Sequence, residues 1–89
     1  MGSRTDEREM NMLIRSQDKK ELHNINRISM IRVVSLTDKH LVEVNSQHTI
    51  GVYSTEEKAI KVIDMIFEDY RNLQFVDATR FQMPQDSEV

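Results

Sequence analysis

The most regular pattern of apolar and polar positions lies between Ser54 and Arg71. Apolar residues recur there at intervals of three and four, and charged residues fill the remaining positions, which predicts an amphipathic α-helix of about five turns. The predicted buried stripe consists of Ala59, Ile63, Ile66 and Tyr70, flanked by Val62, Ile60 and Phe67. Ser54 and Glu57 have the spacing of a capping box, so we expect the helix to begin at Ser54.

Alternating patterns before and after this helix predict short strands. The expected strands lie at 12–16, 21–23, 28–36, 41–44 and 49–53, with a short last strand inside 75–83 that Pro84 ends. Asn24 and Asn26 favour a bend after the second strand, because asparagine tolerates left-handed backbone geometry. Gly51 inside the fifth strand predicts a bulge or close packing under the helix.

The order of these elements predicts an α+β fold. We expect an antiparallel β-meander of about five strands with one long amphipathic helix at about 54–71 and a short C-terminal strand. A small roll of the pleckstrin-homology type is one form that such a chain takes. The expected domain organisation is a tag or disordered arm at 1–11, a single α+β domain at 12–84 and a loose tail at 85–89.

The segment 28–36 has apolar residues on both faces of the predicted strand, although one helix covers only one face of a sheet. Either the sheet curls into a roll that covers its own surface, or the uncovered face meets another chain, for which a two-fold homodimer is the commonest solution. The predicted interaction face is Ile31, Val33 and Arg32.

Composition excludes several classes of protein. The chain has 89 residues, enough for one domain, and its 38% hydrophobic and 30% charged residues are typical of a globular protein. It contains no cysteine, which excludes disulfides and thiolate metal sites, and only two glycines, which excludes glycine-rich phosphate loops. No apolar segment approaches the roughly 18 residues of a membrane span and no secretory signal is visible, so the expected location is cytoplasmic.

The sequence offers no convincing catalytic or metal-binding constellation. His23, His40 and His48 lack the spacing of a metal motif. Serines and threonines fall at expected turns and caps, and the adjacent carboxylates of the helix, Glu56 with Glu57 and Glu68 with Asp69, diverge by 100°. We therefore expect a protein that is not an enzyme and that holds no cofactor and no metal.

Charge is unevenly distributed along the chain. Residues 12–53 carry six Lys and Arg against four Asp and Glu, whereas residues 54–89 carry four against eight. The basic half offers candidate contacts to nucleic acid at Arg15, Lys19, Lys20, Arg27, Arg32 and Lys39. Two facts weigh against that reading: the overall charge is −3, and residues 12–52 contain no Phe, Tyr or Trp on which bases would stack.

Three segments carry a family resemblance: MLIRSQDKKEL at 12–22, IGVYSTEEKAIKVIDMI at 50–66 and FQMPQDSEV at 81–89. The chain resembles small uncharacterised proteins of Gram-positive bacteria and of their phages and mobile elements. The resemblance covers 12–89 and implies that residues 1–11 are added or atypical. It implies an accessory or interaction role and brings no catalytic residue with it.

These observations together predict a small non-enzymatic interaction protein that acts by binding another protein, whose identity the sequence does not give, or a second copy of itself. The alternative is a nucleic-acid-associated regulator that uses the basic residues of the sheet half. No membrane association is expected.

Overall fold

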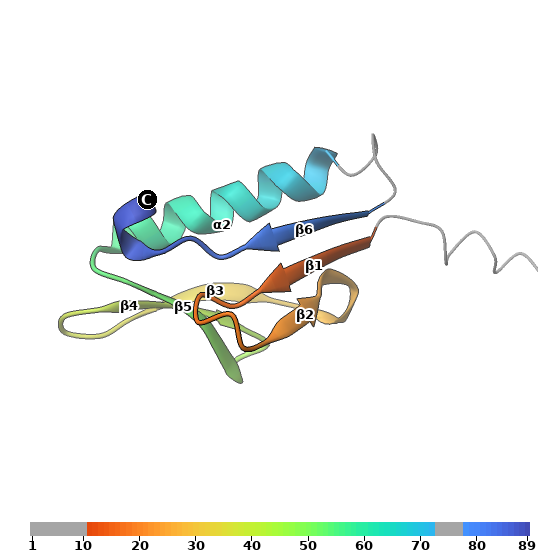
Figure 1. Cartoon of the computed structure of the whole chain (residues 1–89). Coiled ribbons are helices and arrows are strands. Elements are labelled where there is room, and N and C mark those ends of the chain that lie inside the picture. Colours follow the sequence, from red (N-terminus) through yellow and green to blue (C-terminus); the bar gives the residue numbers. More distant parts are fainter. Residues whose placement is uncertain (1–10, 73–77) are drawn as a thin grey trace, which may run out of the picture.

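The computed structural model describes residues 11–72 and 78–89 of the chain. These residues form six strands, one long α-helix and two short 3-10 helices (Figure 1), which confirms the predicted α+β class. In chain order the elements are β1 (Asn11–Arg15), β2 (Leu22–Asn24), η1 (Ile25–Arg27), β3 (Ile31–Ser35), β4 (His40–Val44), β5 (His48–Tyr53), α2 (Glu56–Arg71), β6 (Ala78–Gln82) and η3 (Asp86–Glu88). No helix in these ranges has the length and apolar character needed to cross a bilayer.

The strands form two sheets of three strands each, in the orders β2-β1-β6 and β3-β4-β5. The second sheet is an antiparallel meander of three strands, so the predicted meander of about five strands is divided between two sheets. The first sheet combines the β1–β2 hairpin with β6, which runs parallel to β1 with Ile14 opposite Phe81. A parallel pair needs a long connection, and the whole stretch from β2 to α2 supplies it. The final strand therefore closes the fold beside the first strand, as Figure 1 shows.

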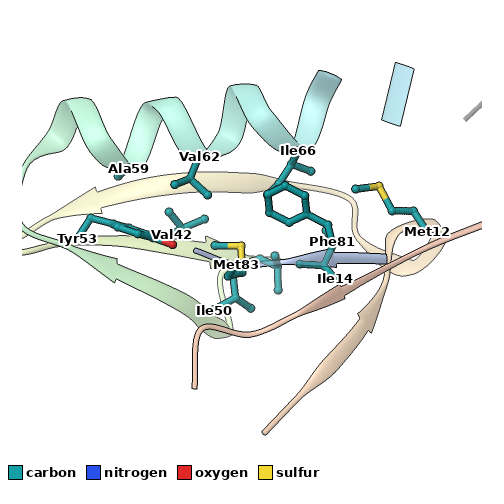
Figure 2. Packing of buried hydrophobic residues seen from close by; sticks show 11 residues of the cluster. Met12, Ile14, Val42, Ile50, Tyr53, Ala59, Val62, Ile66, Phe81 and Met83 are labelled. Atoms are coloured by element: carbon teal, nitrogen blue, oxygen red, sulfur yellow. The ribbon is translucent and has the colours of Figure 1, made fainter. Parts of the chain in front are cut away.

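One hydrophobic core lies between α2 and the inner faces of both sheets (Figure 2). Each sheet thus has its inner face covered. The predicted strand 28–36 is shorter in the structure, at Ile31–Ser35, and the apolar residues on either side of it, Met30 and Leu36, are 39% and 46% exposed. The core residues are Met12, Ile14, Val42, Val44, Ile50, Tyr53, Ala59, Val62, Ile66, Phe81 and Met83.

The start of α2 differs from the prediction. Thr55 is the N-cap, and its hydroxyl accepts a hydrogen bond from the Lys58 N–H at 3.1 Å. Ser54 is instead occupied by the C-terminal segment, because its N–H and its hydroxyl both donate to the Asp86 carboxylate, at 2.8 and 3.1 Å. The predicted capping box of Ser54 with Glu57 is therefore wrong, because the N-cap is Thr55, one residue later.

The buried face of α2 is rotated relative to the predicted stripe. Ala59, Val62 and Ile66 are buried, whereas the predicted stripe member Tyr70 is 40% exposed and its neighbour Phe67 is 57% exposed. The helix therefore turns one apolar flank away from the core, and this flank lines a surface groove described below.

The bulge predicted at Gly51 is present in β5. Val42 of β4 pairs with Gly51 and the next residue, Glu43, pairs with Thr49, so β5 holds one extra residue there. A Cβ atom on Gly51 would lie 2.8 Å from the Tyr53 ring. The close packing that demands glycine here is thus against Tyr53 rather than against the helix.

The last five residues, predicted to be a loose tail, are held by specific contacts. The Lys58 ammonium donates to the Asp86 carbonyl at 3.0 Å, and the Gln85 side chain donates to the Gln17 carbonyl at 3.0 Å. Val89 packs against the core. The tail therefore belongs to the folded domain, and the prediction concerning residues 1–11 lies, apart from Asn11, outside the described residues.

Candidate functional site

Strand β3 forms one edge of the sheet β3-β4-β5, and its hydrogen-bond pattern determines which backbone groups face outward. At one end of the β3–β4 hairpin the Leu36 N–H donates to the Lys39 carbonyl at 2.8 Å. At the other end the Asn45 N–H donates to the Met30 carbonyl at 2.9 Å. Hydrogen-bonded and non-hydrogen-bonded pairs alternate along an antiparallel ladder.

By this alternation, the N–H and C=O groups of Arg32 and Val34 form the hydrogen bonds to β4. The N–H and C=O groups of Ile31, Val33 and Ser35 consequently point to the other side, where no strand of the described residues pairs with them. Such a row of free donors and acceptors is a template for one further strand.

An apolar groove runs beside this edge, between α2 and the segment that leads into β3. Its volume is about 310 Å³. The lining is entirely aliphatic or aromatic: Ile25, Ile28, Ile31, Ile63, Ile66, Phe67 and Tyr70. An extended segment pairing with β3 would direct alternate side chains toward this groove, because successive side chains of a strand point to opposite faces.

The structure separates the three residues of the predicted interaction face. Ile31 and Val33 point toward the helix and pack, partly buried, against the core. Arg32 points to the opposite face of the sheet, where its guanidinium lies 3.3 Å from the carboxylate of Glu43. Both residues therefore contribute outward backbone groups to the β3 edge, and Ile31 also lines the groove, but neither forms part of an open sheet face.

Helix α2 forms one border of the groove and carries a net negative charge. It carries five carboxylates against three cations. Two of the cations already have partners: Lys58 lies 3.6 Å from Asp86, and Arg71 lies 3.4 Å from Glu68. The Arg71 guanidinium also lies over the ring of the groove residue Phe67, 5.8 Å from its centroid, so a cation borders the groove at this wall.

The histidines do not assemble a reactive site. His23 and His48, from different sheets, contact each other with ring centroids 5.3 Å apart and ring planes tilted by 55°. The His23 Nε2 lies 2.9 Å from a Glu21 carboxylate oxygen. The His40 Nδ1 lies 2.7 Å from the Ser35 hydroxyl. Residues 11–72 and 78–89 contain no group of three or more His, Cys, Asp or Glu side chains placed to hold a metal ion.

The pKa of Tyr53 is shifted, and the shift has a structural cause. Burial, reinforced by the negative charges of Asp86 and Glu88, raises the pKa of the Tyr53 hydroxyl to about 12. That hydroxyl donates to the Pro84 carbonyl at 2.8 Å. The contact fixes the C-terminal segment against β5, which is a structural role.

Only part of the predicted basic set comes together. Arg15, Lys19 and Lys20 line one cleft on the outer face of the sheet β2-β1-β6. Arg80 of β6, absent from the predicted set, joins them because β6 pairs with β1. Arg32 lies on the other sheet, paired with Glu43. The remaining two candidates, Arg27 in η1 and Lys39 in the β3–β4 turn, do not line this cleft either.

Comparisons with known proteins leave the chain without an assigned family: no family model, no curated protein and no solved structure matches it. The resemblance to proteins of Gram-positive bacteria and their phages stays a prediction.

Two lining residues of the groove, Ile25 and Ile28, were not identified from the sequence as part of a site. Ile25 lies in the segment that was predicted only as a bend, and Ile28 was predicted as the first residue of the strand 28–36, whereas β3 begins at Ile31. The sequence signal that could have identified Ile25 is an isoleucine outside every predicted strand and helix, which indicates a loop that packs against the domain.

Proposed function

We propose that the chain is a non-enzymatic interaction module that binds another protein by accepting an extended segment of it along β3. The observation that supports this most directly is the pairing of two features at one place. The backbone groups of Ile31, Val33 and Ser35 face outward, and the apolar groove lies at the Ile31 end of this edge. Strand addition uses both features, because main-chain bonds give affinity and pockets for alternate side chains give specificity.

The chemistry of the surface defines the segment that would fit. The groove takes aliphatic side chains on alternate positions, because all of its lining residues are apolar. The intervening side chains would point to the outer face of the sheet, away from α2, where Arg32 and Glu43 lie and polar residues are favoured. We therefore expect the partner segment to alternate aliphatic and polar residues in an extended conformation.

A defined peptide tests this proposal. The probe is a fluorescent, acetylated peptide that alternates isoleucine and lysine, titrated with the protein while fluorescence anisotropy is recorded. Saturable binding is expected with the parent chain. Phe67→Lys should weaken binding at least tenfold, because it removes an apolar groove wall and places a charge where the aliphatic side chains of the peptide would pack. Ser35→Pro should also weaken binding, because proline removes an outward N–H that the β4 ladder does not use.

Two controls separate binding from folding. N-methylation of those peptide residues whose N–H would face β3 should abolish binding to the unmodified protein, whereas N-methylation of the alternate residues should leave it intact. Lys61→Ala, on the exposed side of α2, should bind like the parent. Absence of saturable binding, or equal effects of both N-methylated peptides, would overturn the proposal.

A second copy of the chain is one outcome of the same experiments. Light scattering would then give twice the mass of 10.5 kDa, and Ser35→Pro would return the protein to the monomer mass. A dimer that survived Ser35→Pro would place the contact elsewhere and would contradict the assignment of β3.

A further inference from the structure

A second surface feature lies on the outer face of the sheet β2-β1-β6, away from the core and separate from the groove beside β3. It is a cleft of about 580 Å³. Leu13 and Leu22 provide its apolar part. Its polar lining consists of Arg15, Lys19, Lys20, Glu21, Arg80 and Gln82. Four cations from three different parts of the chain thus share one concave surface with a single carboxylate.

The strand register places two of these cations on the same face. Leu13 of β1 lies opposite Arg80 of β6, and Arg15 lies opposite Gln82. Arg15 and Arg80 are therefore diagonal neighbours, with Cα atoms about 8 Å apart for strands spaced by about 4.8 Å. Side chains as long as arginine readily converge over that distance on one ligand group, and each presents a planar fork that matches a phosphoryl or carboxylate group.

The positive charges of this cleft are not neutralised by ion pairs within residues 11–72 and 78–89. Glu21, the carboxylate of the lining, contacts His23 at 2.9 Å rather than an arginine or lysine. The Arg15 Nε donates to the Lys19 carbonyl at 3.3 Å, which positions the guanidinium and leaves its terminal amino groups for a ligand. Neighbouring like charges repel each other, and a bound anion would relieve that repulsion.

The backbone of the β1–β2 turn adds an independent observation. Lys19 has φ of 67°, a left-handed conformation that glycine or asparagine adopts at lower cost. The turn is held by the Lys19 N–H donating to the Ser16 carbonyl at 2.9 Å, and by the Asp18 carboxylate accepting from the Ser16 hydroxyl at 2.6 Å. These contacts fix the backbone of the turn, so Lys19 and Lys20 are held at the rim of the cleft.

We infer that this cleft binds a small phosphorylated ligand, whose phosphoryl group is held by Arg15 and Arg80 with Lys19 and Lys20 alongside. The volume lies in the range of small-molecule sites. A long polyanion fits less well, because the chain carries a net charge of −3 and the cleft contains no aromatic ring for base stacking.

Calorimetric titration with pyrophosphate tests this inference. We expect saturable binding that Arg15→Gln and Arg80→Gln each weaken at least tenfold, as expected for loss of a charge-assisted hydrogen bond. Arg32→Gln is the matched control, because that arginine is paired with Glu43 on the other sheet, and it should bind like the parent. Circular dichroism melting of each variant confirms that the fold is kept.

Two results would overturn the inference. One is the absence of saturable pyrophosphate binding at low salt. The other is equal binding by the parent and the Arg15→Gln, Arg80→Gln double variant. A ten-residue oligothymidylate is titrated in parallel at two salt concentrations. If it bound with a steep salt dependence while pyrophosphate did not bind, the ligand would be nucleic acid and the small-ligand assignment would be wrong.

Discussion

The side-chain amide of Gln17 bonds the backbone of Val52 in both directions. The Val52 N–H donates to the Gln17 Oε1 at 3.0 Å, and the Gln17 Nε2 donates to the Val52 carbonyl at 3.2 Å. The Gln17 N–H also donates to the Ile50 carbonyl at 2.8 Å. These bonds close the β5 edge of the sheet β3-β4-β5 and connect it to the turn after β1. The β5 edge of this sheet is thus occupied by Gln17 of the same chain. The β3 edge is the one that offers free backbone groups to a further strand.

Replacement of Gln17 by alanine should destabilise the fold by about 1–2 kcal/mol, because its side chain bonds to Val52 and to the Pro84 carbonyl. Urea denaturation followed by circular dichroism measures this loss. Gln47→Ala, in the exposed β4–β5 turn, is the control and should change stability by less than about 0.5 kcal/mol. Equal stability of the two variants would show that the β5 edge does not depend on Gln17.

The two residues before α2 should differ in their contribution to stability. Thr55→Ala should cost about 1 kcal/mol, because it removes the hydroxyl that caps the Lys58 N–H. Ser54→Ala should cost less, because the Ser54 N–H still donates to the Asp86 carboxylate without the hydroxyl. Thermal melting compares the two variants directly, and a larger effect at Ser54 would mean that the helix begins one residue earlier.

Gly51→Ala should destabilise the protein by about 1–3 kcal/mol through overpacking. The added methyl group would lie 2.8 Å from the Tyr53 ring and 2.9 Å from the Met83 methyl group. The ring cannot move away freely, because it is buried and its hydroxyl is bonded to Pro84. Chemical denaturation measures the loss, and the double variant Gly51→Ala, Met83→Ala tests whether Met83 is the neighbour that resists. Unchanged stability of the single variant would contradict the close packing.

The raised pKa of Tyr53 predicts that the folded protein loses stability at high pH. Its pKa is raised from 10.0 to about 12 in the folded protein, chiefly by burial. The folded state therefore holds the proton of the Tyr53 hydroxyl more tightly than the unfolded state. The stabilisation of the fold that comes from this difference is complete below pH 10 and is lost as the pH rises through about 12. In a Tyr70→Phe variant, ultraviolet absorbance follows Tyr53 alone. Ionisation near pH 10 with the circular dichroism spectrum still native would contradict the burial.

The local elements of this fold could be read from the sequence, because periodicity and turn residues determine them. The α-helix, the β3-β4-β5 meander and the bulge at Gly51 follow from such signals. Contacts between distant segments could not be read in the same way. The sequence around Ser54 does not reveal that its hydroxyl donates to the carboxylate of the distant Asp86. Because of that contact, the N-cap is Thr55 rather than the predicted Ser54.

The same distinction between local patterns and long-range contacts applies to the candidate sites. The apolar stripe of α2 was predicted, but its exposed flank at Phe67 and Tyr70 depends on how the helix sits over the sheets. Arg80 was missed as a partner of Arg15 because the parallel pairing of β6 with β1 is a long-range feature. A closer likeness to a roll of the pleckstrin-homology type, and the homodimer, stay predictions.

The central claim, that β3 is an open template for a further strand, is tested most directly by amide hydrogen exchange measured residue by residue with NMR. In the free protein the Arg32 and Val34 amides should be protected, and those of Ile31, Val33 and Ser35 should exchange rapidly. Addition of the isoleucine–lysine peptide should slow exchange at these three amides and leave the first two unchanged. Protection of all five amides in the free protein at every concentration, or no change at the three outward amides when the peptide is bound, would contradict the account.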